Sequence, residues 1–75
     1  MNETLNNQIR RLRFENGEMS QQELADRVGV TRQTIIALEG NKYGPSLLLA
    51  MRIARVFDVP VENVFHFSNG SASKR

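Results

Sequence analysis

The chain has no cysteine and only one histidine among its 75 residues. Without cysteine it has neither a disulfide framework nor a cysteine-based metal site, and it suits a reducing cytoplasm, where we expect it. His66 stands between Phe65 and Phe67, with no thiol partner and no cluster of metal ligands in the sequence around it. A glycine-rich phosphate loop is also missing. We therefore predict no catalytic residue, no metal and no cofactor, and we expect the protein not to be an enzyme.

Long apolar runs are missing as well. The run at 47–50 is short, whereas a membrane-spanning helix needs about 20 apolar residues. Residues 2–7 are too polar for a signal peptide. We expect no association with a membrane. A chain of this length should form one domain near the size at which an isolated core is marginal, so burial against a partner would add stability.

An excess of one charge is nearly absent. Ten basic and eight acidic residues give a net charge of +2, but two of the basic residues, Lys74 and Arg75, end the chain, and residues 1–73 carry eight of each sign. Bulk basicity therefore does not indicate nucleic-acid binding, and only the distribution of charge can. Arg32 and Lys42 are among the basic residues that cluster around one central segment.

That segment, QQELADRVGVTRQTIIALEG at 21–40, is typical of two short helices that cross through a tight turn. Gly29 follows the first of them, where the chain needs a left-handed backbone that glycine adopts without steric cost. Ser20 and Glu23 form a capping box at the start of this first motif helix, and Thr31 can cap the second motif helix in the same way.

Apolar side chains in this segment fall where the two motif helices face each other. These positions are Leu24, Val28, Ile35 and Leu38, with the small residue Ala25 where the helix axes approach closely. Met19 and Val30 each precede a cap and have an apolar partner at the fourth helical position, which predicts a hydrophobic staple at both helix starts.

On these residues the chain resembles the helix-turn-helix proteins of the Cro and phage-repressor type, the xenobiotic-response-element family. The likeness covers roughly residues 5–67 and includes an arginine-rich IRRLR segment and a closing VENVF segment. The resemblance implies an all-α, five-helix, lambda-repressor-like DNA-binding domain. It further implies that the second motif helix enters the major groove of double-stranded DNA while the first crosses the backbone.

Helical periodicity outside the motif predicts three further helices. The first covers residues 5–15, with a buried stripe of Leu5, Ile9 and Leu12. The next begins after the cap Ser46 and covers 47–57. Its expected inward face consists of Leu47, Ala50, Ile53, Ala54 and Phe57.

Pro60 suits the first turn of a short last helix that contains Val61, Val64 and Phe65. At His66–Phe67 a short C-terminal strand is the alternative to helix. We expect the domain to cover residues 1–67 and the polar tail at 68–75 to be disordered.

The outer face of the second motif helix carries the candidates for contacts with DNA bases, namely Arg32, Gln33, Ile36 and Ala37. Glutamine can form two hydrogen bonds to adenine and arginine two to guanine, so we assign Gln33 to a base rather than to solubility alone. Arg32 can reach either a guanine or a phosphate. Because Ile35 takes the buried position, we expect Ile36 to be exposed and to touch a thymine methyl group rather than to pack in the core.

Candidates for phosphate contacts lie on the same side of the motif and are Gln21, Thr31, Thr34, Asn41, Lys42 and Tyr43. Gln21 opens the first motif helix, where free N–H groups attract an anion, and the family resemblance implies that it holds a phosphate. Tyr43 is equally compatible with a role as a partly buried loop anchor. Arg10 and Arg13 are expected to be solvated or paired within the chain.

Several apolar residues are left over by the predicted core, namely Leu48, Met51, Val56 and Phe67. So small a chain should not expose this many large apolar groups without a reason. We therefore assign them to an interface with a second copy of the chain, with burial in a wide core as the alternative for Val56.

These features predict a sequence-specific, double-stranded-DNA-binding transcription regulator that acts as a homodimer on a pseudo-palindromic operator. A repressor is favoured, because so small a protein would act most simply by occupying the operator. Two alternatives stay open: the antitoxin of a toxin–antitoxin pair, and a protein-interaction module that does not bind DNA. Arg32, Gln33 and Thr34 beside Gln21 speak against the interaction module, which has no need of them.

Overall fold

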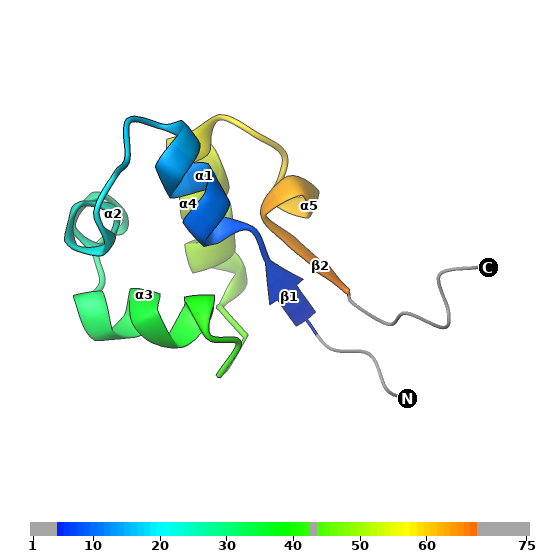
Figure 1. Cartoon of the computed structure of the whole chain (residues 1–75). Coiled ribbons are helices and arrows are strands. Elements are labelled where there is room, and N and C mark those ends of the chain that lie inside the picture. Colours follow the sequence, from blue (N-terminus) through cyan, green and yellow to red (C-terminus); the bar gives the residue numbers. More distant parts are fainter. Residues whose placement is uncertain (1–4, 43, 68–75) are drawn as a thin grey trace.

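The computed structural model describes residues 5–42 and 44–67, and within them the chain forms five short helices and two short strands. In chain order they are β1 Leu5–Asn7, α1 Ile9–Glu15, α2 Gln21–Val28, α3 Arg32–Glu39, α4 Leu47–Phe57, α5 Val61–Val64 and β2 Phe65–Phe67. Figure 1 shows α3 along the bottom of the molecule, α1 in front of α4 above it, and β1 beside β2. The predicted five-helix fold is confirmed, and of the two alternatives at residues 66–67 the strand is the correct one.

The predicted first helix is wrong at its start. Residues 5–7 form β1, which pairs antiparallel with β2 so that Leu5 lies opposite Phe67. The N–H of Gln8 donates to the carbonyl of Val64 at 2.8 Å, and α1 begins only at Ile9. The spacing of Leu5 with later apolar residues suits a helix, but the hydrogen bonds to the other end of the chain favour a strand. For the same reason the last helix ends before Phe65, which belongs to β2.

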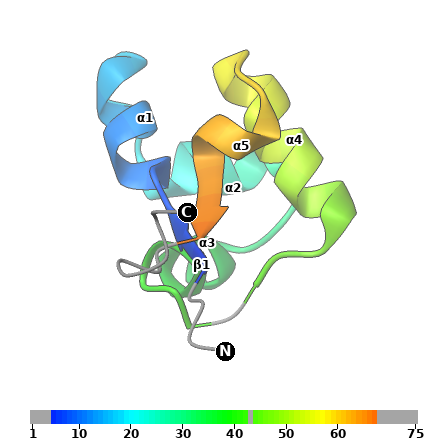
Figure 2. The same ribbon diagram turned by 90° about the vertical axis from the view of Figure 1, so that its right-hand side faces the viewer.

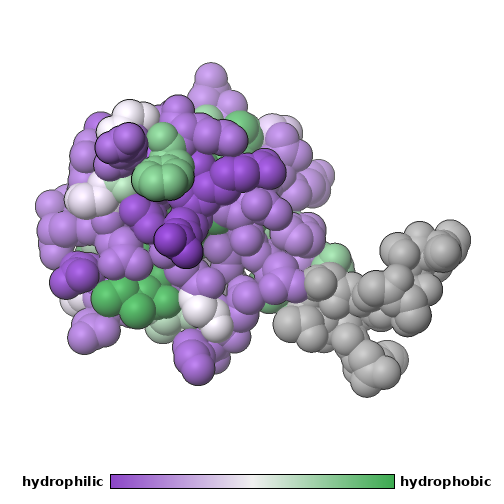
Figure 3. All heavy atoms as spheres, viewed as in Figure 1, coloured by the Kyte–Doolittle hydropathy of each residue, from purple (hydrophilic) through white to green (hydrophobic). Residues whose placement is uncertain are grey.

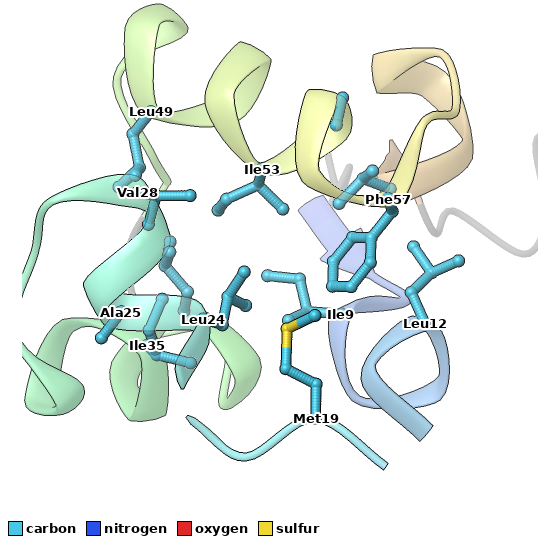
Figure 4. Packing of buried hydrophobic residues seen from close by; sticks show 13 residues of the cluster. Ile9, Leu12, Met19, Leu24, Ala25, Val28, Ile35, Leu49, Ile53 and Phe57 are labelled. Carbon is cyan, nitrogen blue, oxygen red and sulfur yellow. The ribbon is translucent and has the colours of Figure 1, made fainter. Parts of the chain in front are cut away.

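The core lies where the helices meet. Its largest fully buried side chains are Ile9, Leu24, Val28, Ile35, Leu38, Ile53 and Val64. In Figure 4, Phe57 of α4 points toward Leu12 and Ile9 of α1, and Met19 approaches Ile9 from the opposite side. All four apolar positions predicted to lie between the two motif helices are buried. Each such side chain stabilises the fold by about 1.5–3 kcal/mol relative to an exposed one.

The inward face of α4 differs from the prediction at one position. Leu47 is 73% exposed, whereas Leu49 is 8% exposed and lies beside Val28 of α2. Both leucines stand at positions compatible with an apolar stripe, but the side on which α2 packs decides which of them is buried. Val56 is half-buried and packs against the core. Of its two predicted roles, burial in a wide core is therefore the correct one.

No helix within the described ranges has the length and apolar character that a membrane crossing requires. The predicted tail at 68–75 lies outside the described residues.

Candidate nucleic-acid interface

Local hydrogen bonds hold the two motif helices as the sequence predicts. Ser20 caps α2, since its Oγ accepts from the N–H of Glu23 at 2.9 Å. Thr31 caps α3, since its Oγ1 accepts from the N–H of Thr34 at 3.2 Å. Each such cap stabilises a helix by about 1 kcal/mol. Between the two helices Gly29 has φ +78°, the left-handed conformation expected of it.

The capping box at Ser20 is only half formed. The Glu23 carboxylate does not turn back to the cap but accepts from Arg27 Nη2 at 2.7 Å, one helical turn later. Both side chains of this pair are about half exposed, so it adds little to stability.

The outward face of α3 is polar with one exposed aliphatic side chain. Arg32 and Gln33 are exposed and Ala37 is half-buried. Ile36 is 39% exposed while its neighbour Ile35 is fully buried, which confirms the expected exposure. At 100° per residue the four side chains lie within an arc of about 140°. Figure 3 shows a small hydrophobic area over α3 in a mainly hydrophilic surface.

Side chains predicted to hold phosphates flank this face. The hydroxyl groups of Thr31 and Thr34 lie 3.1 Å apart. Lys42 follows α3 and is exposed, and its N–H donates to the carbonyl of Ala37 at 2.9 Å. Tyr43 lies outside the described residues. The structure thus brings the described candidates to the two ends of α3.

An asparagine cluster that the sequence did not indicate ties the end of α3 to β1. Asn7 Nδ2 donates to the carbonyl of Leu38 at 2.8 Å and to Asn41 Oδ1 at 2.9 Å. Asn41 Nδ2 in turn donates to Asn6 Oδ1 at 2.8 Å. Asn41, proposed for a phosphate, therefore already binds two neighbours through its side chain. Nothing in the local sequence signals this cluster, because Asn6 and Asn7 are more than 30 residues away from their partners at the end of α3.

Gln21 at the start of α2 also has a partner within the chain. It is half-buried, and its Nε2 donates to Glu39 Oε1 at 3.2 Å. Glu39 pairs with Arg13 of α1 through two hydrogen bonds, from Nε at 2.7 Å and from Nη2 at 3.2 Å. This confirms the expected intrachain role of Arg13, whereas Arg10 is exposed. Glu39 is missing from the predicted site. Its position four residues after the buried Ile35, on the same side of α3, is the signal that could have drawn attention to it.

A second surface lies on the outward side of α4. Leu47, Leu48 and Met51 are exposed here, and Phe67 is 66% exposed on a different element, β2. Two shallow grooves of about 350 and 300 Å³ run along this side. The first is lined by Leu47, Met51, Ala54, Arg55, Val59 and Val61, and the second by Leu48, Met51, Arg52 and Arg55. Figure 2 shows α5 and β2 toward the viewer, α4 along the right-hand side and α3 at the lower edge.

Comparison with known proteins links this geometry to one family. A family model described as Helix-turn-helix matches residues 9–63. The chain is 59% identical over 58 residues to an uncharacterized HTH-type transcriptional regulator of Methanothermobacter thermautotrophicus, covering 76% of this chain and 83% of that protein. It is 46% identical over 61 residues to the uncharacterized HTH-type transcriptional regulator YgzD of Bacillus subtilis, covering 81% and 91%.

A similar fold occurs in a solved structure. The crystal structure of a candidate DNA-binding protein from Bacteroides fragilis matches with a TM-score of 0.72 at 22% identity, and the match covers 84% of this chain and 100% of that chain. At this identity the likeness concerns the fold alone.

Proposed function

Because the chain belongs to the helix-turn-helix family, we propose that it is a DNA-binding transcription regulator and not an enzyme. In this proposal α3 lies in the major groove of double-stranded DNA and α2 crosses the backbone. The outward face of α3 carries the proposal, since it presents Arg32, Gln33 and Ile36 together on a helix whose other side forms the core. The names of similar proteins, which are HTH-type transcriptional regulators, support it.

Base recognition follows from the chemistry of this face. Gln33 hydrogen-bonds an adenine edge, and Arg32 reaches a guanine or a phosphate. Ile36 touches a thymine methyl group, and Ala37 allows the helix to come close to the bases. The exposure of Ile36 supports this assignment, because contact with the methyl group removes apolar surface from water and so favours binding.

Phosphate contacts fix the position of α3 without carrying sequence information. Gln21 at the start of α2 takes one phosphate, where the free N–H groups of the helix lie. The other members of this set are Thr31, Thr34, Asn41, Lys42 and Tyr43. Lys42 is the cation among them, so it contributes most to the salt dependence of binding.

A homodimer completes the proposal. Leu48, Met51 and Phe67 form its interface, because they are large, apolar and between 56% and 66% exposed. Val56 packs against the core and is left out. A two-fold axis that runs vertically beside α4 in Figure 2 would keep both copies of α3 at the lower edge. Two copies of α3 about 34 Å apart would then bind successive major grooves of a pseudo-palindromic operator and repress by occupancy.

Selection from a random DNA pool tests this function. The expected result is a short half-site enriched as an inverted repeat, with half-site centres about 10–10.5 base pairs apart. Enrichment of a single half-site would contradict the homodimer but would still agree with a sequence-specific transcription regulator. No enrichment would reject sequence-specific binding. A chain that sediments as a monomer, with its α4 surface free, would favour the antitoxin alternative, which needs a surface for a different protein.

A further inference from the structure

Arg13, Gln21 and Glu39 connect parts of the motif that the turn at Gly29 leaves apart. The turn joins the end of α2 to the start of α3. The hydrogen bond from Gln21 to Glu39 joins the opposite ends, the first residue of α2 and the last of α3. The two helices are thus held at both ends, which restricts their separation and crossing angle.

Arg13 makes this connection rigid. The side chains of Arg13 and Glu39 are only 13% and 11% exposed, and paired hydrogen bonds between a guanidinium and a carboxylate fix both groups in one plane. Arg13 Nη1 also donates to the carbonyl of Met19 at 2.7 Å, just before α2. The Glu39 carboxylate therefore has a defined place relative to the start of α2.

The orientation of the Gln21 amide follows from this arrangement. A carboxylate only accepts hydrogen bonds, so Gln21 must turn its NH₂ group and not its carbonyl oxygen toward Glu39. One N–H is used in that bond, and the second is left to donate to another acceptor. A phosphate oxygen at the start of α2 is an acceptor of the required kind.

We propose that Glu39 is a positioning residue for DNA binding and acts through Gln21, whose amide it orients toward a phosphate. The inference rests on the proposed function and adds to it a residue that does not touch DNA. By charge alone, an acidic residue in a DNA-binding motif opposes binding, because it repels phosphates. If Glu39 positions Gln21, removal of its charge weakens DNA binding. If Glu39 acts only through repulsion of phosphates, removal of its charge tightens DNA binding.

The experiment measures the affinity of Glu39→Gln for the selected operator, at a temperature where circular dichroism shows the variant to be fully folded. We expect binding about tenfold weaker, the loss of roughly one hydrogen bond to a charged group. Glu15→Gln is the matched control. It removes the same charge from an exposed pair with Arg11 on α1, and its affinity should be unchanged or slightly higher.

A double-mutant cycle separates positioning from a purely structural role. In a Gln21→Ala background the loss caused by Glu39→Gln should shrink to less than about twofold, because the residue through which it acts is gone. Glu39→Asp keeps the charge opposite Arg13 but is one methylene shorter, and serves as the second variant should Glu39→Gln not fold. It should also weaken binding only when Gln21 is present.

Two results would overturn the inference: folded Glu39 variants that bind as tightly as the wild type or more tightly, and a loss that persists undiminished without Gln21. If the wild-type chain itself binds no DNA, the proposed function and this inference both fail. If the wild type binds and the variants bind equally well, the inference alone fails.

Discussion

Single side chains on α3 and just after it divide the work of DNA binding into sequence recognition and attachment. Gln33 belongs to the first group, since it is exposed on the outward face of α3. Gln33→Ala should cost about 1–3 kcal/mol on the selected operator and relax the preference at one position of each half-site. Binding to the operator and to a scrambled sequence is measured side by side. Equal weakening on both would make Gln33 a backbone contact.

Lys42 belongs to the second group, because it is an exposed cation at the loop after α3. Lys42→Ala should weaken binding to all sequences alike and reduce the slope of log K against log salt by about 1. Lys42→Arg, which keeps the charge, should leave the slope as it is. Titration at several salt concentrations provides the measurement, and an unaltered slope for Lys42→Ala would remove Lys42 from the phosphate contacts.

At the scale of elements, the turn between α2 and α3 depends on Gly29. Its φ of +78° is a conformation that other L-residues adopt only with strain, whereas a Cβ there would make only an ordinary contact, 3.6 Å from Arg52 Nη1. Gly29→Ala should therefore lower the free energy of unfolding by about 1–2 kcal/mol. Gly40→Ala is the control, because Gly40 has φ −86°. Urea denaturation of both variants tests this, and equal stabilities would contradict it.

The second prediction at this scale concerns the link between β1 and α3. Asn7→Ala removes two hydrogen bonds, to the Leu38 carbonyl and to Asn41, and also the acceptor of the Ile9 N–H at 3.1 Å. We expect a loss of about 1–3 kcal/mol in the free energy of unfolding. The exposed Asn63→Ala on α5 serves as the comparison. Thermal unfolding that is the same for both variants would show that the cluster does not stabilise the fold.

For the whole molecule, the prediction concerns the formation of the proposed homodimer. Met51→Glu with Phe67→Glu would place charges in the proposed interface, which should give monomers with unchanged helical circular dichroism and no cooperative operator binding. Phe14→Glu is the matched control, because Phe14 is 65% exposed on α1 and does not belong to the proposed interface. Sedimentation at micromolar concentration distinguishes the states. A double variant that still dimerises would place the interface elsewhere.

The sequence by itself determined the motif. Ser20 and Thr31 cap their helices through bonds that reach only three residues along the chain, and the φ of Gly29 is a property of one residue. The exposure of Ile36 beside the buried Ile35 follows from helical periodicity. These features could be predicted because each depends on interactions within one or two helical turns.

Only the tertiary structure decided the rest. Leu5 is compatible with a helix until β2 comes beside it, and the packing of α2 on α4 chooses Leu49 over Leu47 for burial. The bond from Gln21 to Glu39 depends in the same way on helices brought together by the fold. Local periodicity cannot predict such contacts, because it describes which side of an element is apolar but not which distant partner meets that side.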